Sequence, residues 1–220
     1  MLRIVQGIQP NSSLLPTSFN ECLAGALNQR DRGEATHMAM LHADIAAEVG
    51  WLDVLWSEMW IHGAAFMGTV VPIKAATGRT STAIGIEGDR WHVPRCIFLD
   101  DLARLPQTFG PEHACKPGEV LLANTGCWLA DLRHPFWDWF ATVGQDGCSG
   151  FNIRSRLTGK KGLDGRHEWG VDTRSEDWEL SHEMASFGVR YMVTQRVRLW
   201  HEGGGRWANH REQVVGDNSG

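Results

Sequence analysis

The chain has 220 residues, and we expect residues 1–205 to form one domain and residues 206–220 a flexible tail. Its net charge of −5, from 26 acidic and 21 basic residues, argues against a nucleic-acid-binding face as its main function. Five cysteines form no C-x-x-C pair, so we expect neither a disulfide framework nor a zinc–thiolate centre, and a reducing cytoplasm is the expected location. The sequence has no signal-peptide pattern and no run of about 18 apolar residues, which predicts a soluble chain without a membrane span.

The first half of the chain alternates strand and helix patterns. Apolar residues predict a first strand over 2–8 and a second over 36–41, with a helix at 18–28 between them. A second helix is expected at 48–62, where apolar residues recur on one face, and the apolar run at 66–74 is typical of a strand buried on both faces. This order predicts an α/β protein with a mostly parallel sheet.

The second half is interrupted at 144–174 by a polar stretch rich in glycine and basic residues. A loop of about 30 residues inside a compact domain is usually functional or mobile. Beyond it we expect a helix over 177–187, which Gly188 ends, and then an apolar strand over 193–199. That strand finishes at the polar residue His201.

His42 and Asp44 stand two residues apart where the strand 36–41 ends. Residues at i and i+2 of a strand face the same side, so both side chains can point at one ligand from the edge at which open α/β sheets bind ligands. An imidazole and a carboxylate suit Mn²⁺ or Mg²⁺, and His201 can add a donor from a second strand end. The alternative is that Asp44 caps the following helix while His42 fills the sheet edge.

Glu176 and Asp177 begin the helix that follows the long polar stretch. Acidic residues in the first turn of a helix are stabilised by the helix dipole, and this explanation covers most such clusters. The functional alternative is that one of the two carboxylates acts as a general base or holds an acceptor hydroxyl. Both interpretations remain open at this point.

Six short motifs follow one another in an order that can be compared with known families. They are SFNECLAGAL at 18–27, MLHAD at 40–44, TVVPIK at 69–74, NTGC at 124–127, EDW at 176–178 with a later L-x-x-x-x-x-x-x-G, and T-x-x-V-x-x-x-H ending at 201. This order, over roughly residues 18 to 203, resembles that of the GT-A glycosyltransferases.

The resemblance implies a metal-dependent glycosyltransferase that moves a sugar from a nucleotide-sugar donor to the hydroxyl of a carbohydrate or other acceptor. It implies a single-domain GT-A fold, in which helices flank a Rossmann-like, mostly parallel central sheet. Only one strand and one helix precede the D-x-D position here, so the N-terminal nucleotide-binding part is shortened and the base of the donor is not readable.

The resemblance also assigns roles to individual residues. Asp44 matches the last acid of D-x-D, His42 stands in place of its first acid, and His201 matches a late histidine, so these three would hold Mn²⁺ or Mg²⁺. Asp177 and Glu176 match an acidic pair on the acceptor side and are the expected catalytic residues. The segment expected to line the sugar pocket comprises Asn124, Thr125 and Gly126.

Further residues complete the predicted donor site. The reduced nucleotide platform would consist of Gln6, Gln9, Asn11 and Asn20. Transfer requires the charge of the departing diphosphate to be neutralised, which basic residues can do together with a metal. The basic candidates are Arg79, Arg154, Arg156, Lys160, Lys161 and Arg166. Arg206 and Trp207 would close over the nucleotide as a lid.

Two other functions remain as alternatives. A metal-dependent hydrolase would need a further ligand near His42, for which His37 and His62 are the candidates. A non-catalytic protein that binds carbohydrate or nucleotide would keep the same fold without turnover.

Overall fold

The computed structural model describes residues 14–143, 149–161 and 167–210. The strand expected at 2–8 lies outside these ranges, as does the end of the expected tail, 211–220. Of the predicted site residues, Gln6, Gln9, Asn11 and Arg166 also lie outside them. Within the described ranges, no helix has the length and apolarity that crossing a membrane requires.

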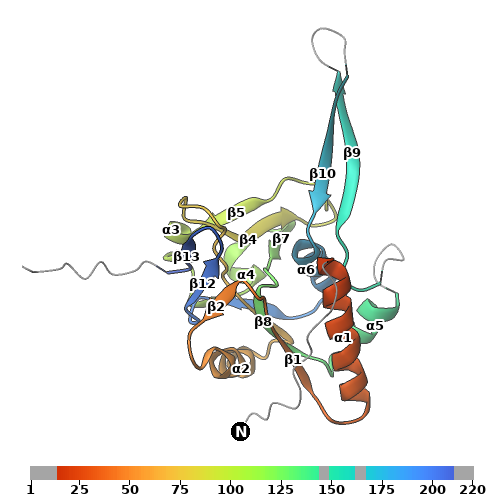
Figure 1. Cartoon of the computed structure of the whole chain (residues 1–220), viewed down its shortest axis with the longest axis vertical. Coiled ribbons are helices and arrows are strands. Elements are labelled where there is room, and N and C mark those ends of the chain that lie inside the picture. The colour runs from red at the N-terminus through yellow and green to blue at the C-terminus, as the bar shows by residue number, and fades with distance from the viewer. Residues whose placement is uncertain (1–13, 144–148, 162–166, 211–220) are drawn as a thin grey trace, which may run out of the picture.

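A mixed five-stranded sheet forms the centre of the molecule, in the order β1-β8-β3-β11-β6 (Figure 1). Its strands are β1 (His37–Leu41), β8 (Cys127–Asp131), β3 (Phe66–Thr69), β11 (Tyr191–Thr194) and β6 (Thr108–Phe109). Only β3 and β11 pair in parallel, and the other three pairings are antiparallel. The expected Rossmann-like, mostly parallel sheet is therefore wrong.

The error in the predicted sheet arises at β8. This strand follows β3 by about sixty residues, yet it inserts between β1 and β3 and runs against both of them. A fully buried apolar run looks the same in the sequence whether its neighbour is parallel or antiparallel. The strand–helix–strand pattern therefore indicated the direction of β1 and β3 but not which strands they pair with.

One consequence of this order carries the functional site. Since β8 runs against both β1 and β3, and β11 runs with β3, the strands β1, β3 and β11 all point the same way. Their carboxyl ends meet at one edge of the sheet, together with the beginning of β8. The residues that follow Leu41 and Thr69 are thus brought close to those that precede Cys127.

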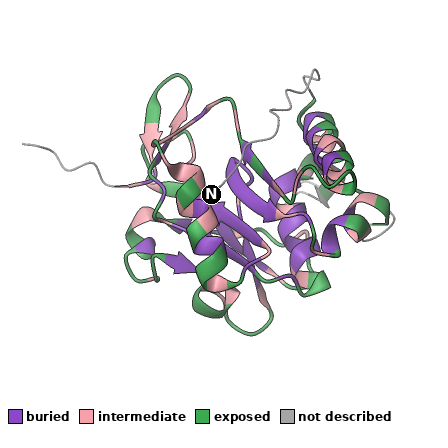
Figure 2. Ribbon diagram, turned by 90° about the horizontal axis from the view of Figure 1, so that it is seen from below, coloured by how far each residue is buried: buried purple, intermediate pink, exposed green. Residues whose placement is uncertain are grey.

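Helices cover both faces of the central sheet. These helices are α1 (Leu15–Asp31), α2 (Trp51–His62), α5 (Phe136–Thr142) and α6 (Glu176–Phe187). Alternate sheet residues belong to two separate apolar clusters, so that Phe66 packs with α1, α5 and α6 whereas the neighbouring Met67 packs with α2. Figure 2 shows the buried strands enclosed between these layers.

Three smaller sheets and two short helices surround this core. The remaining elements are β2 (Ile45–Ala47), β4 (Arg79–Ile86), β5 (Arg95–Phe98), α3 (Leu99–Leu102), α4 (Pro111–Ala114), β7 (Glu119–Leu122), β9 (Arg154–Lys161), β10 (His167–Arg174), β12 (Leu199–Glu202) and β13 (Arg206–Ala208). Their sheets are β13-β12-β2, β5-β4-β7 and the hairpin β10-β9, and all of these pairings are antiparallel.

Two sequence expectations change with these elements. The stretch 144–174, expected as a loop, contains the hairpin of β9 and β10. The single strand expected over 193–199 is two strands, because β11 ends at Thr194 and His201 lies in β12 of a different sheet. The first three residues of the segment 206–220 form β13.

Candidate functional site

Asp44 lies beyond the carboxyl end of β1 and contacts two cationic or potentially cationic side chains. Its Oδ2 accepts a hydrogen bond from Lys74 Nζ at 2.7 Å and lies 3.2 Å from His201 Nε2. Burial raises the pKa of Asp44, but Lys74 and His201 outweigh this effect and hold the pKa below its usual value. Asp44 is therefore a carboxylate at neutral pH.

Asp44 does not cap the helix that follows it. Between them lies strand β2, and α2 begins at Trp51 with Gly50 in the left-handed region at its N-cap. The backbone carbonyl of Asp44 instead accepts a hydrogen bond of 2.7 Å from the N–H of Glu202 in β12. This hydrogen bond, together with the pairing of β2 and β12, brings His201 beside Asp44.

His201 is oriented by the main chain on the other side of its ring. Its Nδ1 lies 2.8 Å from the carbonyl oxygen of Pro72, and since a carbonyl only accepts, Nδ1 carries the proton. Nε2 is thereby directed at Asp44. Metal-binding histidines commonly donate their second ring nitrogen to a backbone carbonyl in this way.

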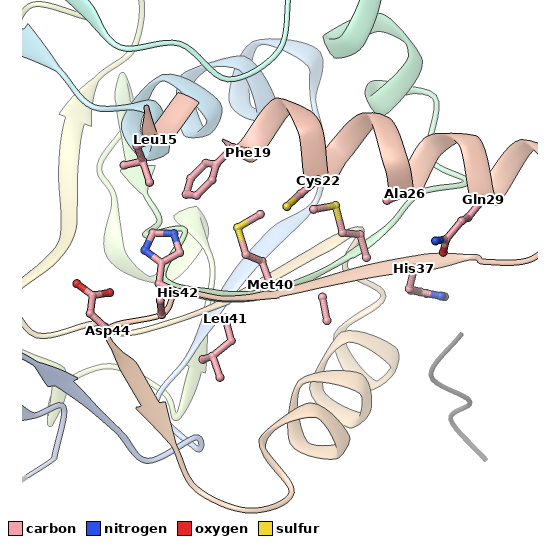
Figure 3. Close-up of a pocket in the computed structure, with 13 residues that line it drawn as sticks. Leu15, Phe19, Cys22, Ala26, Gln29, His37, Met40, Leu41, His42 and Asp44 are labelled. Atoms are coloured by element: carbon pink, nitrogen blue, oxygen red, sulfur yellow. The ribbon is translucent and has the colours of Figure 1, made fainter. Parts of the chain in front are cut away.

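His42 lies at the end of a large cavity between α1 and β1, of about 770 Å³, that Asp44 also lines (Figure 3). Its ring packs against Phe19 at 5.0 Å, and its buried Nε2 has no hydrogen-bond partner among the described residues. Burial lowers the pKa of His42 despite the opposing charge of Asp44. A neutral imidazole with an unused buried nitrogen is chemically able to bind a ligand.

The donor set was tested against a divalent cation. Among the described residues, no group of three or more His, Cys, Asp and Glu side chains is arranged to hold a metal ion. Asp44 and His201 supply two donors that fit Mg²⁺ or Mn²⁺, which commonly complete their coordination with substrate phosphates and water. Lys74, which the sequence analysis missed, places a built-in cation on the same carboxylate oxygen. Its position two residues after Pro72, at the end of a buried run, was the available signal.

The segment 124–126, expected to line a sugar pocket, is joined to both His42 and α6. The N–H of His42 donates to the carbonyl of Gly126 at 2.9 Å, and the N–H of Gly126 donates to Asn124 Oδ1 at 2.6 Å. Asn124 Nδ2 in turn donates to Asp177 Oδ2 at 2.9 Å. Thr125 is buried, and its hydroxyl has no hydrogen-bond partner within the described part of the chain.

Asp177 and Glu176 differ in their surroundings although they are neighbours. Asp177 accepts hydrogen bonds from the Ser175 hydroxyl, the N–H of Trp178 and the amide of Asn124, so it holds the segment 124–126 in place. Burial raises the pKa of Asp177, against the lowering effect of these donors. Glu176 is 6% exposed, and burial followed by the charge of Asp177 raises its pKa to about 7, which is the range of a general base.

A smaller cavity of about 280 Å³ lies on the other side of Pro72. Arg79, Arg206 and Trp207 all line it, and Pro72 connects it to His201. Arg206 pairs with Glu202 at 2.9 Å and stacks its guanidinium on the ring of Trp200 at 4.4 Å. Three residues predicted for the donor site are thus brought together.

Other predicted residues lie elsewhere. Asn20 exchanges two hydrogen bonds with the backbone of Phe151 and so anchors that loop to α1. Arg154 pairs with Glu179 at 3.3 Å and Arg156 pairs with Asp172 at 3.0 Å. Lys160 and Lys161 belong to β9.

The two histidines considered for a hydrolase are engaged with other acidic residues. The ring of His37 lies 3.9 Å from Asp131, and that of His62 lies 3.5 Å from Glu58.

No family model matches this chain. The comparisons also find no matching curated protein and no matching solved structure. The function is therefore inferred from the chemistry of the site.

Proposed function

We propose that this chain transfers a sugar from a nucleoside-diphosphate sugar to an acceptor hydroxyl, with Asp44 and His201 holding Mn²⁺ or Mg²⁺. The observation that carries the proposal is the pairing of Asp44 with His201, beside a cavity lined by two arginines. The proposal depends on these side chains and not on the topology of the sheet.

The basic residues around Asp44 match the charge of a diphosphate leaving group. Lys74 touches Asp44, and Arg79 and Arg206 line the adjoining cavity. Fixed cations that stabilise a departing diphosphate lower the barrier to transfer, and a bound divalent metal would add to that stabilisation. The indole of Trp207 offers an aromatic face on which a base or sugar ring can stack.

On the acceptor side, Glu176 is the proposed base and Asp177 is a positioning residue. A carboxyl group whose pKa lies near 7 can take a proton from a hydroxyl at neutral pH. Asp177 is already engaged by three donors, and through Asn124 it fixes the segment that contacts His42. The four described cysteines are free, which fits a reducing compartment such as the cytoplasm.

A thermal-shift screen tests the proposal. The full chain is heated with UDP-, GDP-, ADP- and dTDP-sugars, each with and without Mn²⁺, and CMP-sugars with a single phosphate serve for comparison. A specific donor should raise the melting temperature only with the metal, since ligand at about 100 times its Kd stabilises by about 2.7 kcal/mol. Absence of a shift with every nucleoside-diphosphate sugar would overturn the proposal.

Two variants locate the binding site. Asp44→Ala should abolish the metal-dependent shift, whereas Asp131→Ala should retain it, because Asp131 ends another strand and pairs with Arg133. A shift that survives Asp44→Ala removes this residue from the donor site. A shift with free sugars but not with nucleotide-sugars would instead indicate a carbohydrate-binding protein.

A further inference from the structure

The hairpin of β9 and β10 projects from the body of the molecule (Figure 1). In the described part of the chain its two strands form a sheet by themselves, with eight paired positions from Arg154↔Arg174 to Lys161↔His167. An isolated two-stranded ribbon is marginally stable in water and usually needs a surface to cover one of its faces. The hairpin is thus a candidate for contact with a partner.

One face of the hairpin is apolar and exposed. Leu157 pairs with Val171, and Gly159 pairs with Trp169, so all four residues share this face. The exposed fractions are 76% for Leu157, 63% for Val171 and 70% for Trp169. A side chain at Gly159 would collide with the indole of Trp169, whose Cζ3 lies 3.0 Å from the position of a Cβ, so the ring lies across the glycine.

The opposite face is polar and is attached to the body at its base. Arg156 pairs with Asp172 at 3.0 Å and places its guanidinium over the ring of Trp91 at 4.4 Å. Arg154 pairs with Glu179 of α6 at 3.3 Å. These contacts hold the polar face against the protein.

The charge of this segment is opposite to that of the rest of the chain. Residues 154–174 contain six basic and three acidic residues, which gives a net charge of +3. The remaining residues, 15 basic and 23 acidic, carry −8. A partner of the hairpin should therefore be negatively charged, and a second copy of the same hairpin would be repelled.

We propose that the β9–β10 hairpin docks this protein on the surface of a bilayer that contains anionic lipids. Trp169 would lie at the level of the headgroups, where tryptophan is enriched, and Leu157 and Val171 would enter the boundary of the acyl chains. The positive charge of the segment would be attracted to anionic headgroups. A nucleic acid fits less well, because aliphatic side chains neither stack on bases nor form hydrogen bonds with them.

Flotation of the full chain with lipid vesicles tests the proposal. Vesicles of phosphatidylcholine alone are compared with vesicles that also contain phosphatidylglycerol, at low and at high salt. Binding to the anionic vesicles should exceed binding to the neutral ones by at least about tenfold at low salt, and salt should weaken it. Absence of binding to the anionic vesicles would overturn the proposal.

Variants assign vesicle binding to the hairpin. The double variant Leu157→Ser, Trp169→Ser should reduce binding about tenfold or more, since it removes most of the apolar face. Trp60→Ser is the matched control, because Trp60 is a tryptophan of α2 that is 80% exposed, and it should leave binding unchanged. Unchanged binding by the double variant would contradict the assignment.

Two further measurements keep the outcome interpretable. The charge variant Lys160→Glu, Lys161→Glu leaves the apolar face intact, and it should also lose anionic-vesicle binding; circular dichroism confirms that each variant is folded. Filter binding of RNA and sedimentation velocity test the other partners. RNA binding without vesicle binding, or a dimer that the double variant abolishes, would overturn docking on a bilayer. None of these assays contains a nucleotide-sugar, so their result is independent of the proposed transferase activity.

Discussion

Asp44 shows how a single carboxylate can be held between a lysine and a histidine at the edge of a sheet. Lys74 and His201 approach the same oxygen, Oδ2, and the main chain at Pro72 fixes the orientation of the histidine. Lys74 and Asp44 are partly exposed, so their ion pair adds at most about 1 kcal/mol to stability. Their arrangement is better explained by ligand binding than by stability.

Replacement of Lys74 by methionine should separate these two roles. We expect Lys74→Met to raise the pKa of Asp44, because the hydrogen bond and charge that lower it are removed. It should also strengthen Mn²⁺ binding, since no ammonium group then competes for Oδ2. NMR titration of the Asp44 carboxyl and calorimetry with Mn²⁺ measure the two effects.

Arg133→Met is the matched control for this experiment, because Arg133 lowers the pKa of Asp131 in a similar pair at another strand end. It should leave both Asp44 properties unchanged. An Asp44 pKa that does not move in Lys74→Met would refute the role assigned to Lys74.

Gly126 occupies a position with no room for a side chain. A Cβ there would lie 2.7 Å from Asn124 Oδ1 and 3.3 Å from Val71 Cγ2. Gly126→Ala should therefore lower the free energy of unfolding by about 1–3 kcal/mol and displace Asn124 from Asp177. Gly204→Ala, where a Cβ meets nothing within 4 Å, should change it by less than about 0.5 kcal/mol. Urea denaturation of both variants checks this, and equal stabilities would contradict the steric explanation.

At the scale of elements, α6 connects two parts of the molecule. Asp177 and Ser181 bond to the segment 123–126 beside the candidate site. Further along the same helix, Glu179 and Glu183 both pair with Arg90, at 2.5 and 2.9 Å. The helix therefore fixes the sheet edge on one side and the turn between β4 and β5 on the other.

Two titrating residues of α6 should give opposite dependences of stability on pH. Burial raises the pKa of Glu176 from 4.5 to about 7, so its contribution is present below pH 4.5 and is lost as the pH rises to 7. Burial, followed by the charges of Arg90 and Arg174, lowers the pKa of His182 from 6.5 to about 4, so its contribution is lost as the pH falls from 6.5 to 4. Each effect amounts to at most about 3 kcal/mol, and they oppose each other between pH 4.5 and 6.5.

Glu176→Gln should therefore make stability rise with pH over this range, and His182→Gln should make it fall. Urea denaturation of the wild type and both variants at several pH values measures these slopes. If both variants kept the pH profile of the wild type, neither group would titrate as its burial requires.

At the scale of the whole molecule, stacked aromatic rings join the central sheet to the helices on one face. Trp128 of β8 is fully buried, and its ring lies 5.3 Å from that of Phe66 and 6.1 Å from that of Trp137 in α5. Phe136 and Phe140 extend the stack toward α6 and the loop at Phe151. This cluster holds β8 between β1 and β3.

Removal of the central ring should be costly. Trp128→Ala is expected to lower the free energy of unfolding by about 3–5 kcal/mol, because it leaves a large cavity in a packed core. Trp60→Ala, at an exposed position of α2, should lower it by less than about 0.5 kcal/mol. Denaturant titrations of the two variants compare the values, and a small loss at Trp128 would show that the core can repack around β8.

Local patterns located the ends of several elements well. The strand expected at 36–41 is β1 from His37 to Leu41, and the helix expected at 177–187 is α6 from Glu176 to Phe187. These boundaries depend on apolar periodicity and on Gly188, which adopts the left-handed conformation at the end of α6. The placement of Asp44 at a strand end, and of Asn124 and Gly126 just before another, follows from the same signals.

The sequence by itself determined which polar residues stand at the ends of buried strands, because a strand end depends on neighbouring residues. The tertiary structure alone decided that β8 lies between β1 and β3, that β12 brings His201 to Asp44, and that Lys74 reaches the same carboxylate. Strand order, strand direction and such contacts depend on packing between segments far apart in the chain. An apolar run records that it is buried but not which strand lies beside it.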